Sequence, residues 1–189
     1  MRFDDVMGLV HITLAVSLDG YVTGADPTPE QPLGTAGDVI APGGERWMAE
    51  KTLAEAGAVV AGRRTYDHVH GWGEEPPFRL PVFVPTHRPQ PVREAGATTF
   101  TFVPDVGTAI AAARDVAGDA DVYVMGGART ADQALALGLV DEVRLHVFPV
   151  LLGAGEQLFT DLGGGRISLE RTELVGGPRA THVVYRVRR

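Results

Sequence analysis

The chain has 189 residues, of which 44% are hydrophobic and 22% charged, and a formal net charge of −7. This acidic balance excludes the broad cationic surface that nucleic-acid binding needs, and no apolar run approaches the roughly 18–20 residues of a membrane span. The lack of cysteine excludes disulfides, cysteine nucleophiles and thiolate zinc sites, and favours a cytoplasmic location. We expect one domain over residues 1–189 that binds a small molecule, and neither nucleic acid nor a membrane.

The first predicted strand covers residues 8–17 and is apolar on both faces, as in the middle of a helix-covered sheet. It ends in Leu18-Asp19-Gly20, where Asp-Gly indicates a turn. Asp19 is either a turn former or a carboxylate beside a ligand. Residues 24–44 predict a long ordered loop, and residues 45–56 a helix that ends at Gly57. Trp47 lies on the expected inner face of this helix, where it is core or ligand wall.

Two further strands are followed at once by polar or basic groups. The strand at 58–61 runs into Gly62-Arg63-Arg64-Thr65, and the strand at 80–84 into Thr86-His87-Arg88. An arginine pair is usually a solvated face, but at the carboxyl end of a sheet strand it is well placed to clamp a phosphate. His68 and His70 have no apparent third ligand, so we expect no metal.

The stretch 121–137 has the most informative pattern in the chain. A buried strand, 121–125, is followed by Gly126-Gly127-Ala128-Arg129-Thr130 and a helix that ends at Gly138. In this layout backbone N–H groups at a helix N-terminus face an anion, and glycine lets a phosphate approach the main chain. The G-x-G-x-x-G fingerprint is absent, so this is not an ordinary dinucleotide turn.

The remaining elements complete the expected sheet. Residues 98–103 predict a peripheral strand and 105–117 a core helix, while 143–148 predict a strand that buries Val143, Leu145 and Val147 on one face. Two alternating strands, 167–174 and 181–187, predict an antiparallel hairpin. Together the elements predict an α/β, three-layer α-β-α fold with a mixed, mainly parallel sheet.

In such sheets ligands bind beyond the carboxyl ends of the strands. Three of the predicted strand ends carry phosphate-binding groups, which favours a ligand with several phosphates. The arginines, in an otherwise acidic chain, favour NADP over NAD.

The chain resembles the dihydrofolate-reductase-like family that includes the reductase domain of the riboflavin-biosynthesis deaminase–reductase (the RibD C-terminal domain) and its stand-alone relatives. The resemblance lies in the order and spacing of these motifs: Ser17-Leu18-Asp19-Gly20, Gly62-Arg63-Arg64-Thr65-Tyr66, Pro81-Val82-Phe83-Val84 with Thr86-His87, Val124-Met125-Gly126-Gly127, Gly138-Leu139-Val140-Asp141-Glu142 and Pro149-Val150-Leu151-Leu152-Gly153. The zinc site of the companion deaminase needs cysteine, so this chain cannot supply it.

The resemblance implies a dihydrofolate-reductase-like fold, NADPH as hydride donor and a homodimer. The residues it implies at the cofactor are Ala15, Gly62, Arg63, Arg64, Thr65, Thr86, His87, Arg88, Met125, Gly126, Gly127, Ala128, Arg129 and Thr130. The residues expected at the substrate are Asp19, Trp47, Leu151, Leu152 and Gly153.

The predicted reaction is hydride transfer to a C=N or C=O carbon of a small, polar, heterocyclic or ribosyl substrate, as in 5-amino-6-(5-phosphoribosylamino)uracil reductase. Water, Asp19 or Glu50 would supply the proton. Counting back from Gly62 places the helix acid of true dihydrofolate reductases near Arg46, with Glu45 and Glu50 as the nearby carboxylates. Alternatives are a dihydrofolate or pteridine reductase and a non-catalytic nucleotide-binding module.

Overall fold

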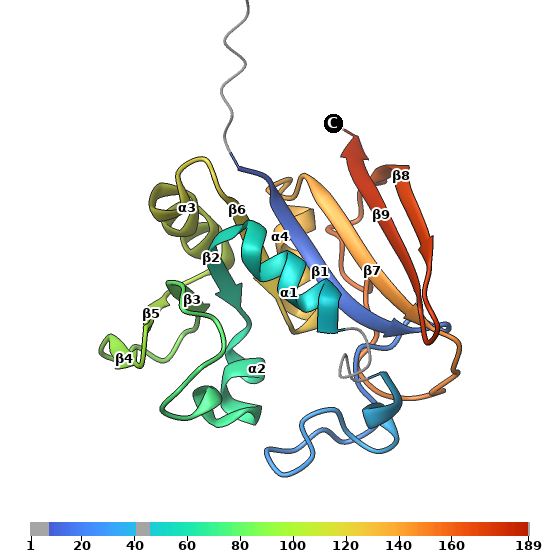
Figure 1. Cartoon of the computed structure of the whole chain (residues 1–189), viewed down its shortest axis with the longest axis horizontal. Helices are drawn as coiled ribbons and strands as arrows, with labels where there is room; N and C mark the ends of the chain where they lie inside the picture. The colour runs from blue at the N-terminus through green and yellow to red at the C-terminus, as the bar shows by residue number, and fades with distance from the viewer. Residues whose placement is uncertain (1–7, 41–45, 189) are drawn as a thin grey trace, which may run out of the picture.

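The structure is a computed structural model that describes residues 8–40 and 46–188, with the backbone alone at 46–49. The described strands form one nine-stranded sheet of order β4-β5-β3-β2-β6-β1-β7-β9-β8 (Figure 1). Its strands are β1 (Val10–Ser17), β2 (Ala56–Ala61), β3 (Val82–Pro85), β4 (Arg93–Ala95), β5 (Thr98–Val103), β6 (Asp121–Met125), β7 (Glu142–Phe148), β8 (Ser168–Gly176) and β9 (Thr181–Arg188). The helices are η1 (Gly37–Ile40), α1 (Arg46–Glu55), α2 (Arg63–His68), η3 (His70–Trp72), α3 (Val106–Ala117) and α4 (Ala128–Ala136).

The centre of the sheet is parallel and its two margins are antiparallel. β1 pairs in parallel with both β6 and β7, and β2 pairs in parallel with β6 and β3. β4 pairs antiparallel with β5, while β9 pairs antiparallel with β7 and β8. The predicted fold class is therefore confirmed, including the C-terminal antiparallel hairpin. The carboxyl ends of β2, β3 and β6 meet at one edge of the sheet.

Helices cover both faces of the sheet because the parallel strands are apolar on both sides (Figure 1). On β1, Ile12 and Leu14 belong to the large core cluster beneath α3 and α4, together with Ile110 of α3. Thr13 and Ala15 point to the opposite face, which α1 covers. This second face carries the candidate site.

Three elements differ from the sequence expectations. β2 begins at Ala56, because Ala56 pairs with Asp121 and a bulge separates it from Ala58. Gly57 therefore lies in the sheet, where a Cβ would stand 2.8 Å from Cα of Ala117. The short edge strand β4 was not predicted at all.

β7 is buried on both faces rather than on one. Val143 is buried on the expected face, whereas Leu145 and Val147 are only partly buried. His146 and Phe148, on the opposite face, are also buried. The predicted face does pack on the core, but the burial of the opposite face was not predicted; it arises because β7 is flanked by β1 and β9 and carries pocket residues on the α1 side of the sheet.

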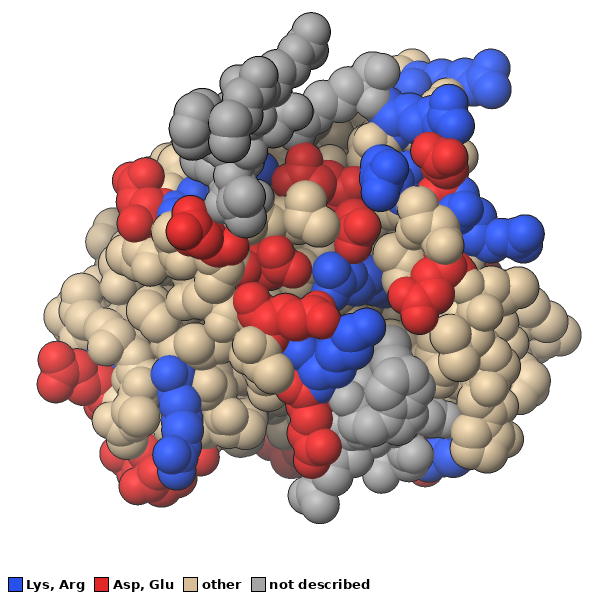
Figure 2. Space-filling model, turned by 45° about the horizontal axis from the view of Figure 1, so that its top comes forward, with Lys and Arg blue, Asp and Glu red and all other residues tan. Residues whose placement is uncertain are grey.

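Acidic and basic side chains are interspersed on the face of the molecule in Figure 2, with no broad basic area. Among the described helices, none has the length and apolar character that a membrane crossing would require.

Candidate active site

A polar groove lies where the carboxyl ends of β2, β3 and β6 meet. Its volume is about 380 Å³. The sequence predicted that these strand ends lie together, because neighbouring parallel strands end at the same edge of a sheet. The groove is lined by Gly62, Arg63, Arg64, Thr65, Thr86, His87, Arg88, Gly127, Arg129 and Thr130 of the predicted cofactor residues, and by Pro85, Pro104, Asp105, Val106, Gln133 and Glu156.

The glycines at this corner are needed for close packing and for an unusual backbone. Gly126 and Gly127 have φ of +65° and +77°, a region that residues with a Cβ rarely adopt. A Cβ on Gly126 would stand 2.8 Å from the Thr65 side chain, and one on Gly62 would stand 2.7 Å from Oγ1 of Thr130. The corner therefore holds the main chain of β6 and α4 directly against α2.

The N-terminus of α4 opens on this groove. Gly127 is the N-cap residue, and no side chain caps the helix there. The first N–H groups of a helix have no partner within the helix, and they carry its partial positive charge. Gly127 and Arg129 both line the groove, so these groups fit a phosphate.

Two arginines on the groove are held in place by one carboxylate. Nε of Arg63 lies 2.8 Å from Oδ1 of Asp67, and Nη2 of Arg88 lies 2.9 Å from Oδ2 of the same residue. Nη1 of Arg63 donates to Oγ1 of Thr86 over 3.4 Å. Because the guanidinium of Arg63 is fixed from two sides, it can receive a phosphate with little loss of side-chain entropy.

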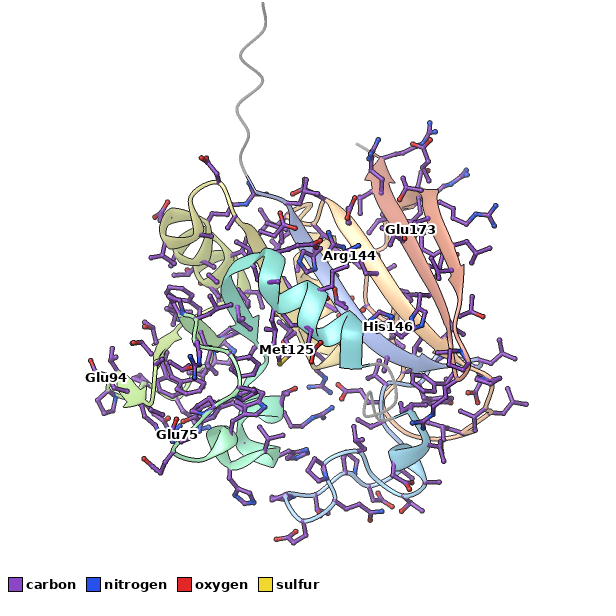
Figure 3. The ribbon with its side chains drawn as sticks, in the orientation of Figure 1. Glu75, Glu94, Met125, Arg144, His146 and Glu173 are labelled. Atoms are coloured by element: carbon purple, nitrogen blue, oxygen red, sulfur yellow. The ribbon has the colours of Figure 1, made fainter. Side chains whose placement is uncertain are left out.

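A second, mainly apolar pocket of about 460 Å³ adjoins the groove on the face of the sheet that α1 covers. Met125 and His146 reach it from the sheet (Figure 3). Ala15, Met125 and Gly126 of the predicted cofactor residues line this pocket rather than the groove, and Ala128 lines neither. The rest of the lining comes from β1, β6 and β7, from residues 22–40 and 69–78, from α1 and α2, and from Gly127 and Glu156.

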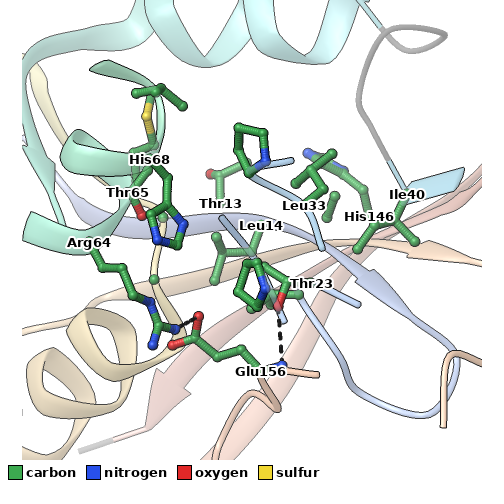
Figure 4. A pocket seen from close by; sticks show the side chains of 18 of the residues that line it. Thr13, Leu14, Thr23, Leu33, Ile40, Arg64, Thr65, His68, His146 and Glu156 are labelled. Atoms are coloured by element: carbon green, nitrogen blue, oxygen red, sulfur yellow. Dashed lines mark hydrogen bonds and ion pairs between the residues drawn. The ribbon is translucent and has the colours of Figure 1, made fainter. Parts of the chain in front are cut away.

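An ion pair marks the boundary between groove and pocket. Arg64 and Glu156 both line the two spaces, and their side chains contact each other there (Figure 4). The N–H of Glu156 donates to Oγ1 of Thr23 over 3.2 Å, which ties residues 149–158 to the loop after β1. The second carboxylate oxygen of Glu156 is buried and has no hydrogen-bond partner among the described residues.

The floor of the pocket rests on a buried polar layer. Nδ1 of His11 lies 2.9 Å from Oγ1 of Thr13, and the His11 ring stacks on Tyr123. Burial and, to a smaller extent, the positive charge of Arg144 together lower the pKa of His11 to about 3. Burial likewise raises the pKa of Tyr123. Both rings are therefore uncharged at neutral pH, and they support Thr13, whose carbonyl oxygen accepts a hydrogen bond from the Tyr123 hydroxyl over 3.4 Å.

Asp19, which was predicted at the substrate, is absent from the described lining of the pocket. Its carboxylate accepts the Oγ–H of Ser17 at 2.6 Å and the backbone N–H groups of Leu152 and Gly153 at 3.1 and 2.8 Å. These bonds, that of Ser17 above all, lower the pKa of Asp19 below its ordinary value. A carboxylate that is stabilised in its charged form is a poor proton donor, and here it clamps two loops together.

The other predicted substrate and catalytic residues do not gather at the pocket. Leu151, Leu152 and Gly153 are absent from its described lining, and Leu151 is 70% exposed, because this segment turns back onto Asp19. Glu50 lies on an exposed part of α1, outside the described lining. The side chain of Trp47 lies outside the described residues, as does Glu45.

Sequence reasoning missed several pocket residues. His68 of α2 and Trp72 of η3 line it, although His68 was considered only as a metal ligand, and rejected, and Trp72 was assigned to a loop. Ile40, Phe148 and Glu156 also line it, from three separate segments. They share no pattern in the sequence, since they lie in α2, η3, η1, at the end of β7 and in the loop after β7.

Comparison with known proteins places the chain in a family. The family model described as the RibD C-terminal domain matches residues 9–178. The chain belongs to the RibD C-terminal domain family. The family resemblance stated from the sequence is thus confirmed.

Solved structures related to this family are similar over nearly the whole chain. A putative riboflavin biosynthesis protein from Shewanella sp. PV-4 is 25% identical, with a TM-score of 0.74, and the match covers 96% of this chain and 99% of that one. The Thermotoga maritima diaminohydroxyphosphoribosylaminopyrimidine deaminase/5-amino-6-(5-phosphoribosylamino)uracil reductase is 15% identical, with a TM-score of 0.66. That match covers 96% of this chain and 57% of that protein, so the chain spans little more than half of it.

Two other matches define the limits of the comparison. The dihydrofolate reductase of Enterococcus faecalis, complexed with NADP(H) and RAB-propyl, has a TM-score of 0.65 at 17% identity, and the match covers 96% of this chain and 97% of that one. At this identity the likeness shows the fold alone. Among curated proteins, the uncharacterized protein YyaP of Bacillus subtilis is 48% identical over 42 residues, a stretch that spans 22% of each chain.

Proposed function

We propose that the protein is an NADPH-dependent reductase of the riboflavin-biosynthesis reductase type, acting on a C=N or C=O group of a small heterocyclic compound. The observation that carries this proposal is the continuity of two spaces. A groove with Arg63, Arg64, Arg88 and Arg129 passes the Gly126–Gly127 corner and opens into an apolar pocket. A dinucleotide has the same division, with charged phosphates at one part and an apolar nicotinamide ring at the other.

The residues of this chain fit such a cofactor. Gly127, Arg129 and the first N–H groups of α4 would hold the pyrophosphate, and Arg63 with Thr86 and Arg88 would hold the adenosine phosphate. Ala15 and Met125 would lie beside the nicotinamide ring. When bound, NADPH supplies a hydride to the acceptor carbon. The apolar walls keep water from the ring and orient the acceptor, which is the main contribution of the protein.

The reduced product also needs a proton, and His68 can supply it. His68 lines the apolar pocket, and Figure 4 shows its ring directed into the cavity. Histidine is the side chain that most often transfers a proton in enzyme active sites. Asp19 is tied into a loop contact, so we assign the proton to His68 or to water rather than to Asp19.

Titration of the protein with NADPH and NADH, followed by tryptophan fluorescence and by thermal unfolding, tests the cofactor. We expect micromolar binding of NADPH and much weaker binding of NADH. Gly127→Asp should abolish binding, because it places a carboxylate at the phosphate site. Gly165→Asp is the matched control, since a Cβ at Gly165 meets nothing within 4 Å. Unchanged fluorescence and melting temperature at saturating NADPH would overturn the assignment.

A substrate screen then separates the enzyme from a nucleotide-binding module. NADPH oxidation, followed at 340 nm with carbonyl, imine and pteridine compounds, is expected for a reductase. Tight NADPH binding without oxidation by any of them would instead favour the module. Since NADPH is regenerated in the cytoplasm, the proposal includes a cytoplasmic location. It also includes a homodimer, which the exposed faces of β8 at the end of the sheet support.

A further inference from the structure

We infer that the hydride acceptor is a compact, uncharged and mainly apolar carbonyl or imine compound that carries no phosphate. This inference rests on the proposed function and names the substrate class of the same site. It differs from the expectation of a polar or ribosyl substrate. It also separates this chain from the Thermotoga maritima protein, which is named for a phosphoribosyl compound.

The first observation is the chemistry of the pocket walls. Apolar side chains enclose the space from four sides, on the loop after β1, on η1, on α1 and on the segment that follows α2. These residues are Val22, Leu33, Ile40, Leu53, Val69, Trp72 and Phe78, and Phe148 of β7 closes the sheet side. Such walls stabilise a ligand through the apolar surface that it buries, and the aromatic members contribute most area.

The second observation is where the positive charges lie. Among the described residues that line the apolar pocket, Arg64 is the sole arginine or lysine, and Glu156 pairs with it. Arg63, Arg88 and Arg129 line the groove and not the pocket. A phosphate placed among the apolar walls would lose its hydration without gaining a cation other than Arg64, whose charge Glu156 already balances, which is unfavourable. Phosphate recognition therefore belongs to the cofactor side of the boundary.

The third observation is the small set of polar groups that remain. The polar residues that line the pocket, besides Arg64 and Glu156, are Thr13, Thr23, Thr52, Thr65, His68, Tyr123 and His146. Thr52 is 4% exposed and lies on the helix that covers the pocket. These groups can orient a carbonyl, an imine or a ring nitrogen through one or two hydrogen bonds.

The volume limits the size of the acceptor. At about 460 Å³ the pocket is near the lower end of the roughly 300–1,000 Å³ that small-molecule sites have, and the nicotinamide ring would occupy part of it. A compound of one or two rings fits the remainder.

The test compares two probes that differ only in a phosphate, 6-hydroxy-2-naphthaldehyde and its phosphate ester, 6-formyl-2-naphthyl phosphate. Isothermal titration calorimetry is performed on the protein with saturating NADPH and, without NADPH, in concentrated phosphate buffer, so that inorganic phosphate competes with the ester for the arginines of the groove. We expect the uncharged aldehyde to bind about tenfold or more tightly than the ester in both states. Equal binding, tighter binding of the ester, or binding of neither probe would overturn the inference.

A variant adds an independent measurement. Leu33→Lys places a cation on the pocket wall, so it should weaken the binding of the aldehyde and strengthen the binding of the ester. Leu137→Lys is the matched control, because Leu137 follows the last residue of α4 and is 57% exposed. It should change neither affinity. A Leu33→Lys variant that leaves the ratio of the two affinities unchanged would contradict the assignment of the wall. Because the wild-type comparison without NADPH needs no cofactor, failure of cofactor binding and failure of this inference are distinguishable.

Discussion

Replacing Arg63 with glutamine should weaken the binding of NADPH far more than that of NADH. Arg63 is the first residue of α2, directly after the end of β2, where Asp67 and Thr86 fix its guanidinium, and it lines the groove together with Gly127. If the corner takes the pyrophosphate, then Arg63 faces the phosphate that NADPH has and NADH lacks.

The magnitude follows from the burial and fixation of this side chain. An exposed ion pair is worth less than about 1 kcal/mol, but the Arg63 side chain is only 16% exposed. A hydrogen bond to a charged group contributes about 1.5–3 kcal/mol, which corresponds to a rise of about 10- to 150-fold in the Kd for NADPH. The Kd for NADH should rise less than about threefold.

Fluorescence titration at constant ionic strength measures both affinities. Arg171→Gln is the matched control, because it removes the same charge from an exposed position on β8. It should leave both constants unchanged. An equal loss for NADPH and NADH would show that Arg63 faces the pyrophosphate, and no loss for either would refute the reasoning about this groove.

Three further outcomes concern stability and assembly. The pKa of His11 falls from 6.5 to about 3 on folding, so the unfolded chain binds the proton more tightly and acid destabilises the fold. In chemical denaturation, the free energy of unfolding should fall by about 2 kcal/mol between pH 7 and pH 5, and His11→Gln should not show this loss. An equal loss in the wild type and the variant would contradict the role of His11. Asp132, 2% exposed, accepts the N–H groups of residues 159–161. Asp132→Ala should cost about 3 kcal/mol in urea unfolding, against almost nothing for the exposed Asp115→Ala, and equal costs would refute the role of these bonds. Leu174→Glu, on β8 at 55% exposure, should convert the proposed dimer to a monomer in light scattering, whereas an unchanged mass would place any interface elsewhere.

Much of the cofactor groove could be predicted from the sequence, because each of its parts is local. A buried strand followed by glycine or by Arg63-Arg64 defines a strand end, and parallel pairing brings such ends to one edge. The predictions for Gly62, Arg63 and Gly127 needed no knowledge of packing. They stay predictions about a ligand, although the structure does bring the residues together.

The substrate side could not be predicted in the same way. Ile40, Phe148 and Glu156 meet only after η1, the end of β7 and the following loop have packed around one space. The sequence suggested a one-faced β7 strand, and so it missed the buried His146. It also suggested that the carboxylate of Asp19 contacts the substrate, whereas this carboxylate accepts hydrogen bonds from the N–H groups of residues 152 and 153.

The sequence by itself determined the family, the order of the elements apart from β4, and the edge of the sheet for which we propose phosphate binding. Those features depend on the periodicity of hydrophobic residues and on the backbone conformations that glycine permits, and both are local properties of the sequence. Only the tertiary structure decided which side chains form the apolar pocket, that Arg64 is paired with Glu156, and that Asp19 is a loop clamp. The physical reason is that each of these depends on groups from distant segments, and their meeting is set by packing and hydrogen bonding across the whole fold.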